Sequence, residues 1–480
     1  MKAISLTLTL AVAIPAAAGA QTKPVPPART PRTTAAAPRI PLEEYHLANG
    51  LTVLLSVDHS APVVAVDVEH HVGSKNEEVG RTGFAHLFEH VMFTGSGHVP
   101  YGTHDKFTEG VGGSNNGSTN NDKTNFYESV PSNYLQTELW LESDRLGWLL
   151  DALDIAKLNA QRDIVKNERR QSYDNRPYGR VGEIMDAELY PEGHPYHWPV
   201  IGSMTDLSAA SDADVKAFYN KWYGPNNTVL VIVGDFNPAE TKAWVQKYFG
   251  AIPRGGAITR PVVPAAHLDH AKRFVYEDAV SQPELFIEWP GVGDKSPDRA
   301  ALSIMGSIIS GDRTQWLTQE FVYNRKWASS ISLRAGMNEN AGDVGLSVVP
   351  TPGIDLTRLE GAIDSVIDRF RREGPTAEQM KKATAGIEFG SYNRLQSMLG
   401  KAMTLASGWI YHDDPAFYAK DLTETLAVTA ADVKRVADTY LGPNRIVLSA
   451  VPMGKRNLAS HPDQSTPITS PFALTKQAVP

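Results

Sequence analysis

The chain has 480 residues, of which 42% are hydrophobic, so it is long enough for roughly two to four domains with buried cores. Its formal net charge of −8 argues against a broad nucleic-acid-binding surface and against a polybasic patch for a membrane. The sequence has no cysteine, which excludes a cysteine nucleophile, a lipid-modified cysteine and a disulfide framework.

The first 20 residues have the features of a secretory signal peptide. Lys2 precedes an apolar stretch over 4–17, and Ala18-Gly-Ala20 supplies the small residues of a cleavage site. We therefore expect export to the periplasm and a mature chain beginning at residue 21; the alternative is an uncleaved anchor. Residues 21–40 are rich in Pro, Ala and Thr, which predicts a disordered lead-in. After signal cleavage, no segment is apolar enough to predict a membrane span.

Folded structure is predicted to begin near residue 41 with strands. Residues 45–55 form two strands around an Asn49-Gly50 hairpin turn, and 61–68 form another. Thr82 and Gly95 can cap and end a helix over the segment between them. Further helices are predicted over 133–151, 155–174, 357–372 and 376–396. Strands occur in hairpin-like pairs as well as between helices, which favours an α+β class over a doubly wound sheet.

The segment 83–93 predicts a buried helix that carries three polar side chains. His86, Glu89 and His90 are spaced i, i+3 and i+4, so a helix places them on one face, while its other faces are apolar. Burying two imidazoles and a carboxylate is costly unless a partner such as a zinc ion binds them. This inverted His-x-x-Glu-His pattern therefore predicts a zinc site with Glu89 as general base. The alternative is two core histidines hydrogen-bonded to a glutamate.

A catalytic zinc ion usually takes three protein ligands, so a third ligand is needed. Glu168 lies in the predicted helix over 155–174, seven residues after Gln161, so both side chains point the same way. From spacing alone Glu168 is a weak candidate, because most helical glutamates are solvated.

A repeat with an offset of 218 residues indicates a duplicated domain. Residues 213–233 recur at 431–451 with ten identities in 21 positions, and each copy reads as a helix, a Gly-Pro-Asn turn and a buried strand. The predicted domains are a zinc-bearing domain at 41–255, a linker at 256–264, a homologous domain without zinc at 265–454 and an irregular tail at 455–480.

With these segments in place, the sequence resembles the pitrilysin-like (M16) metallopeptidases, particularly the processing-peptidase subfamily, from about residue 41 to about residue 451. The segments that carry the resemblance are 81–93, 116–119, 140–146, the helix of Glu168 and 223–227. The resemblance implies that His86, His90 and Glu168 bind one zinc ion per chain. It also implies two tandem α+β domains that form half of a clam-shell around a chamber for short or unfolded polypeptides.

The resemblance further implies that one segment pairs with the backbone of the substrate as an edge strand. From the residues alone this segment reads as an ordinary loop. Its residues are Asn116, Gly117, Ser118 and Thr119.

The sequence departs from the family at two places. Family members usually carry Glu at the position of Gln161, and an amide cannot accept a proton, so we expect reduced or altered activity with zinc binding retained. Trp316 and Ser329 occupy the positions of an Arg and a Tyr that clamp the substrate in the family, while Arg313 and Tyr323 lie nearby but out of register. We therefore predict that a homologous subunit supplies the clamp in a heterodimer; a homodimer is the alternative.

The second copy is predicted to have no metal site. At the offset of 218, the three motif residues fall on Ile304, Ser307 and Ile308. Two other histidine pairs, 70–71 and 194 with 197, are interpreted as structural.

The predicted function is therefore a zinc metalloendopeptidase, although manganese or cobalt could replace zinc. The alternative is a non-catalytic assembly or peptide-binding subunit of the same family.

Overall fold

The computed structural model describes residues 38–472. The predicted signal peptide at 1–20 and most of the lead-in at 21–40 lie outside the described residues, so both stay predictions. Ile40 already belongs to the core, since it packs among buried side chains and its backbone N–H donates to the Tyr418 hydroxyl at 2.6 Å.

The first half of the described chain builds a mixed sheet of six strands in the order β1-β2-β6-β3-β5-β4. Strands β2 and β6 are parallel, and every other neighbouring pair is antiparallel. The predicted hairpin is confirmed as β1 and β2, with Gly50 in its turn at a φ of 92°, where glycine is favoured. The strands are β1 (Glu43–His46), β2 (Thr52–Val57), β3 (Val63–His70), β4 (Ser114–Thr119), β5 (Thr124–Pro131) and β6 (Thr228–Gly234).

The second half builds another six-stranded sheet, in the order β12-β7-β11-β8-β10-β9, and five of its strands repeat the arrangement of the first sheet. The parallel pair β7 and β11 matches β2 and β6, and the antiparallel neighbours from β11 to β9 match those from β6 to β4. The edge strand β12 differs, because it is parallel to β7 whereas β1 is antiparallel to β2. The offset of 218 residues carries β6 onto β11 residue for residue, as the internal repeat predicts. The strands are β7 (Lys272–Asp278), β8 (Glu284–Pro290), β9 (Ala328–Met337), β10 (Gly342–Pro350), β11 (Ile446–Pro452) and β12 (Thr466–Pro467).

Helices surround both sheets, and the four long helices predicted from the sequence are confirmed as α3, α4, α10 and α11. Their order in the first half is α1 (Phe84–Val91), α2 (Thr103–Gly110), α3 (Leu135–Ala152), α4 (Ile155–Arg169), α5 (Val181–Leu189), α6 (Met204–Ala209), α7 (Asp212–Trp222) and α8 (Pro238–Phe249). The second half has α9 (Arg299–Ile309), α10 (Leu356–Glu373), α11 (Ala377–Arg394), α12 (Met398–His412), α13 (Phe417–Ala427) and α14 (Ala430–Tyr440). The α+β class with two tandem related units is therefore confirmed.

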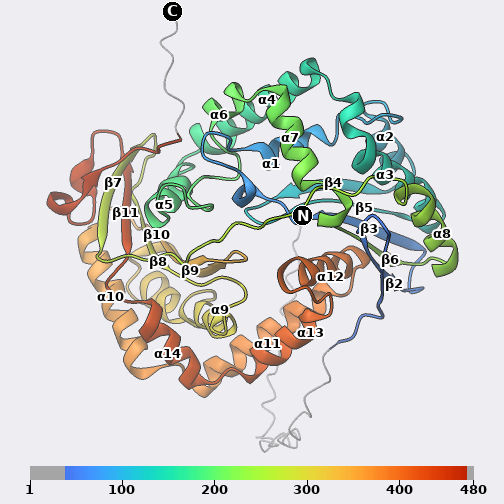
Figure 1. Ribbon diagram of the computed structural model, residues 1–480. Helices are drawn as coiled ribbons and strands as arrows, with labels where there is room; N and C mark the ends of the chain where they lie inside the picture. The colour runs from blue at the N-terminus through green and yellow to red at the C-terminus, as the bar shows by residue number, and fades with distance from the viewer. Residues whose placement is uncertain (1–37, 473–480) are drawn as a thin grey trace, which may run out of the picture. The chain divides into compact units, whose positions relative to one another are not determined.

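The two halves exchange helices: one helix from each half packs on the sheet of the other half. Helix α12 of the second half packs on β3 and β6 of the first sheet (Figure 1). Its Leu405 lies in one core with Val231. Helix α5 of the first half packs on β8 and β11, and its Ile184 shares a core with Leu448. The predicted boundary at 256–264 divides the chain in sequence, but the packing crosses it in both directions.

Two smaller features complete the fold. Within the predicted irregular tail, β12 adds a two-residue parallel strand to β7. Across residues 38–472, none of the helices combines the length and apolarity that crossing a membrane requires.

Candidate metal centre

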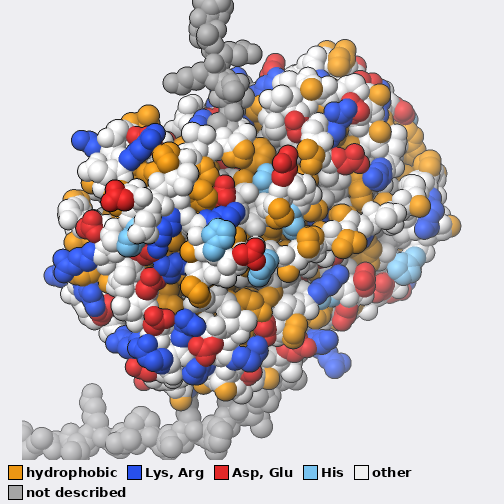
Figure 2. All heavy atoms as spheres, turned by 60° about the vertical axis from the view of Figure 1, so that its left-hand side comes forward, with side chains coloured by type: hydrophobic (Ala, Val, Ile, Leu, Met, Phe, Trp, Pro, Cys, Tyr) orange, Lys and Arg blue, Asp and Glu red, His pale blue; other side chains and the backbone are white. Residues whose placement is uncertain are grey.

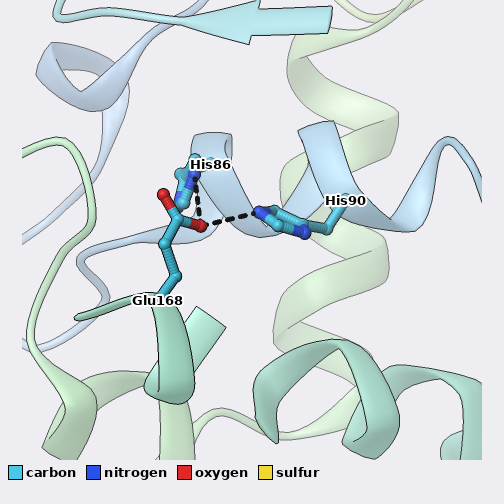
Figure 3. A group of neighbouring side chains, drawn as sticks. All are labelled: His86, His90 and Glu168. Carbon is cyan, nitrogen blue, oxygen red and sulfur yellow. Dashed lines mark hydrogen bonds and ion pairs between the residues drawn. The ribbon is translucent and has the colours of Figure 1, made fainter. Parts of the chain in front are cut away.

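Helix α1 presents two histidines on one side and an apolar surface on the other. Leu87, Phe88 and Val91 are fully buried in the core of the first half. His86 and His90 project from the opposite side of α1 and point toward Glu168, whose side chain extends from α4 (Figure 3). The structure therefore brings together the three residues that the sequence and the family resemblance select as metal ligands.

The start of α1 is held differently from the sequence prediction. Thr82 is not the cap, because its hydroxyl donates to Asp206 at 2.7 Å instead. Gly83 is the N-cap residue with a φ of 89°, and the buried carboxylate of Glu77 accepts the backbone N–H groups of Gly83 and Ala85 at 2.8 and 2.9 Å. Glu77 thus fixes the first turn, directly before His86. The helix also ends earlier than predicted, since its last residue is Val91.

The spacing of the three side chains suits a single divalent ion. Oε2 of Glu168 lies 3.5 Å from Nε2 of His86 and 3.2 Å from Nε2 of His90. Two donors held about 2.1 Å from one tetrahedral ion lie about 3.4 Å apart. Two imidazoles and one carboxylate are also a common donor set for catalytic zinc. The residues present therefore fit a zinc ion.

The local electrostatics keep these groups in the protonation states that bind a metal. Burial lowers the pKa of His86 to about 4, so its imidazole is neutral near pH 7. The hydrogen bond with His90 lowers the pKa of Glu168, which stays ionised. Burial raises the pKa of Glu89, opposed by the hydroxyl of Thr119. Glu89 is thus set apart from Glu168 as the carboxyl group that gains a proton more readily.

Two features hold Glu168 in place from its own helix. Asp154 caps the start of α4 by accepting the backbone N–H of Lys157. At the other end the fully buried Arg169 pairs with Glu183 of α5 at 3.0 Å, and the chain continues as a π-helical turn over Arg170–Asp174. Gln161 is buried two turns before Glu168 on the same helix. Its effect on activity stays a prediction.

The segment Asn116–Thr119 is a strand rather than the loop that its composition favours. It belongs to β4, which lies at the edge of the first sheet and pairs only with β5 among the described strands. Gly117 sits tightly against the rings of Phe126 and Phe93, since a Cβ there would lie 3.2 Å from both. The other side of β4 pairs with no described strand, and its pairing with a substrate stays a prediction.

In the second half, apolar residues lie where the first half has the two histidines, and Trp316 and Ser329 have contacts within their own half. Ile304 and Ile308 are fully buried in α9, in the core of the second half. Trp316 packs edge-on against Phe370 at a ring distance of 5.2 Å. Ser329 is exposed on β9 and donates to the Val349 carbonyl at 3.3 Å.

The other histidine pairs have structural partners. His70 contacts the Thr228 hydroxyl at 2.8 Å, and His71 contacts Glu339 at 2.7 Å. His194 and His197 each contact a backbone carbonyl. Glu77 is not recognisable from the sequence, because it lies six residues before Gly83 and only the folded chain brings its carboxylate to the start of α1.

Comparison with known proteins identifies the family. A family model described as "Insulinase (Peptidase family M16)" matches residues 52–190, and one described as "Peptidase M16 inactive domain" matches 209–387. The zinc protease PqqE of Helicobacter pylori is 26% identical over 406 residues, which cover 83% of this chain and 90% of that protein.

Solved structures agree in fold. The crystal structure of a protease from Helicobacter pylori matches with a TM-score of 0.80 and 25% identity, over 86% of this chain and 100% of that one. The first half of the periplasmic protease PqqL from Escherichia coli matches with a TM-score of 0.68 and 18% identity, over 87% and 93%. With family models covering both halves and the fold shared throughout, the chain belongs to peptidase family M16.

Proposed function

We propose that this chain is the metal-carrying subunit of a zinc metalloendopeptidase that cleaves short or unfolded polypeptides. The observation that carries the proposal is the convergence of His86, His90 and Glu168, with the carboxylate of Glu89 on the same helix as both histidines. The family model that matches residues 52–190 spans all four residues. Manganese and cobalt also bind side chains of this kind, but zinc is the more common metal at such a site.

Glu89 is the proposed general base. Its pKa is raised by burial, which suits a group that must accept and then release a proton near neutral pH. Glu89 takes a proton from the attacking water and passes it to the leaving amine. A zinc ion held by His86, His90 and Glu168 supplies the Lewis acidity that activates water and polarises the scissile carbonyl.

Strand β4 is the proposed binding site for the substrate backbone. Thr119, at its end, lies against Glu89, so an extended peptide paired with β4 would run past the general base. Pairing through backbone groups gives affinity without strict sequence preference. Only extended polypeptides can pair in this way, which favours short or unfolded substrates over folded proteins.

A second subunit is proposed to complete the site. Trp316 is packed against Phe370 and Ser329 bonds to its own sheet, so neither can replace the missing Arg and Tyr. A homologous subunit that carries both residues would supply them in a heterodimer within a clam-shell; a homodimer is the alternative. The similarity to a protease named as periplasmic supports the same location for this chain.

Cleavage of an unstructured peptide with a quenched fluorophore tests the proposal. The full chain is assayed with zinc, alone and with a homologous clamp-bearing subunit, beside Glu89→Gln and, as a matched control, Glu192→Gln at an exposed loop position. We expect cleavage only with the partner, lost in Glu89→Gln and retained in the control. Equal cleavage by Glu89→Gln and the wild type would refute the assigned base. No cleavage in any combination would favour a non-catalytic subunit, the reading supported by the "inactive domain" match at 209–387.

A further inference from the structure

A second cluster of ligand-type side chains is buried in the first half, outside the candidate zinc centre. Its members come from three elements within residues 103–152. Glu128 lies on β5, Glu138 and Glu142 lie one turn apart on α3, and His104 lies on α2. The three carboxylates are at most 1% exposed, and the His104 side chain is 12% exposed. Such a group of carboxylates is expensive to bury without a cation.

Glu128 is the residue whose surroundings most directly indicate a bound ligand. It is fully buried, and neither of its carboxylate oxygens has a hydrogen-bond partner among residues 38–472. Nε2 of His104 also has no hydrogen-bond partner within the same residues. Yet one donor atom from each of His104, Glu128 and Glu142 lies within 4.8 Å of the others. The two unpaired side chains, His104 and Glu128, thus converge beside Glu142, whose carboxylate also contacts Arg145.

The charges of the cluster do not balance within the protein. Arg145 pairs with Glu142 and is the cation in direct contact with it. Three carboxylates and one guanidinium leave two negative charges. Burial raises the pKa of Glu138 to about 7 and that of Glu128 further, with repulsion from Glu142 adding to the second shift. One divalent cation could remove this excess, and so could bound protons, of which one shared between Glu128 and Glu142 is the competing arrangement.

The spacing favours a cation. Nε2 of His104 lies 3.5 Å from Oε2 of Glu138 and 3.6 Å from Oε1 of Glu142. Contacts of this length are too long for strong hydrogen bonds. They match the separation of about 3.4 Å between two donors on one tetrahedral ion, as at the candidate zinc centre.

We propose that His104, Glu128, Glu138 and Glu142 form a second, structural site for a divalent metal ion. One imidazole with three carboxylates is a set of mostly hard donors, which suits Mn²⁺ as well as Zn²⁺. The ion ties α2 to α3 and β5. Because Asp105 of α2 accepts from the Asn115 side chain of β4 at 2.8 Å, the ion also steadies the edge strand. This proposal does not depend on peptidase activity.

Metal content after equilibrium dialysis tests the proposal on the full chain. Wild type, His90→Ala, Glu128→Gln and the double variant are dialysed against Mn²⁺, and bound metal is measured by mass spectrometry. We expect His90→Ala to keep one ion per chain and the double variant to keep none. A His90→Ala protein without metal would overturn the proposal, as would a double variant that still holds one ion, which would reveal an adventitious surface site only.

Thermal unfolding gives an independent readout in the His90→Ala background. With the site present, Mn²⁺ raises the melting temperature, and Glu128→Gln abolishes that rise. If the cluster instead shares protons, Glu128→Gln mimics the protonated acid, and the melting temperature is independent of Mn²⁺ in both proteins. His104→Gln, at the partly exposed rim, serves as the second variant if Glu128→Gln does not fold, and it is expected to abolish the same rise.

Discussion

A buried ionic network joins the two halves of the chain, and it predicts a large effect of one substitution. Glu339, in the turn between β9 and β10, contacts His71 at 2.7 Å and pairs with Lys75, which is also held by Asp122 at 2.9 Å. The side chains of Lys75 and Glu339 are 1% and 4% exposed. Removing the charge of Glu339 leaves Lys75 buried with one partner in place of two.

The cost of Glu339→Gln follows from this geometry. Removing one partner of a buried ion pair typically costs 3–5 kcal/mol, and because Asp122 still pairs with Lys75 we expect about 2 kcal/mol. Urea unfolding of the metal-free protein measures this difference. Glu378→Gln, at an exposed position on α11, is the matched control and should change stability by less than about 0.5 kcal/mol. Equal stability of the two variants would refute the network as a source of stability.

The same variant should respond to pH in a defined direction. Burial acts to raise the pKa of Glu339, but the contacts with His71 and Lys75 outweigh it and hold the pKa well below its usual range. A depressed carboxyl pKa contributes stability above the unfolded-state value of about 4.3, and this contribution is lost as the pH falls below that value. The penalty of Glu339→Gln should therefore be constant above about pH 5 and shrink below about pH 4. A penalty that grows on acidification would contradict the assigned charges.

Three further predictions concern the site and the exchanged helices. Gln161→Glu should raise turnover without changing zinc content, and steady-state kinetics with metal analysis would show a fall in turnover if the idea is wrong. Gly117→Val should lower kcat/KM at least about tenfold, because a side chain there displaces β4 from Phe93 and Phe126, while zinc content stays equal to that of wild type. Leu405→Ala should cost about 2–4 kcal/mol in urea unfolding, since Leu405 is fully buried on the first sheet; a cost below 1 kcal/mol would mean that α12 is not needed to cover it.

The local pattern of the chain predicted part of the helices and strands and two of the three proposed metal ligands. The spacing of His86, Glu89 and His90 is a property of one helix, so it can be read without tertiary structure. The offset of 218 residues predicted that β6 and β11 occupy equivalent places, because a duplicated segment keeps its hydrophobic pattern. Glu168, however, needed the family resemblance, since its partners lie 78 or more residues away.

What the sequence could not show are contacts that arise only between distant elements. The sequences of α5 and α12 do not indicate that these helices pack on the sheet of the other half. An apolar face predicts that a helix is buried, but it does not predict which sheet buries it. Glu128 reads as a polar residue in a strand, and only the folded chain brings His104 beside it. The strand at Asn116–Thr119 is similar, since polar residues and a glycine favour a loop and pairing with β5 overrides that preference.

The duplication also provides an internal comparison for the cost of the metal site. Helices α1 and α9 occupy equivalent positions, and α9 places Ile304 and Ile308 where α1 has His86 and His90. The fold itself is thus satisfied by apolar residues, whereas Nδ1 of His86 is buried without a partner among the described residues. Replacing both histidines by isoleucine should stabilise the metal-free protein by about 1–2 kcal/mol. With zinc present the order should reverse, because only the wild type gains binding energy. Urea unfolding with and without zinc measures both, and a variant less stable than the metal-free wild type would show that the histidines serve the fold rather than the metal.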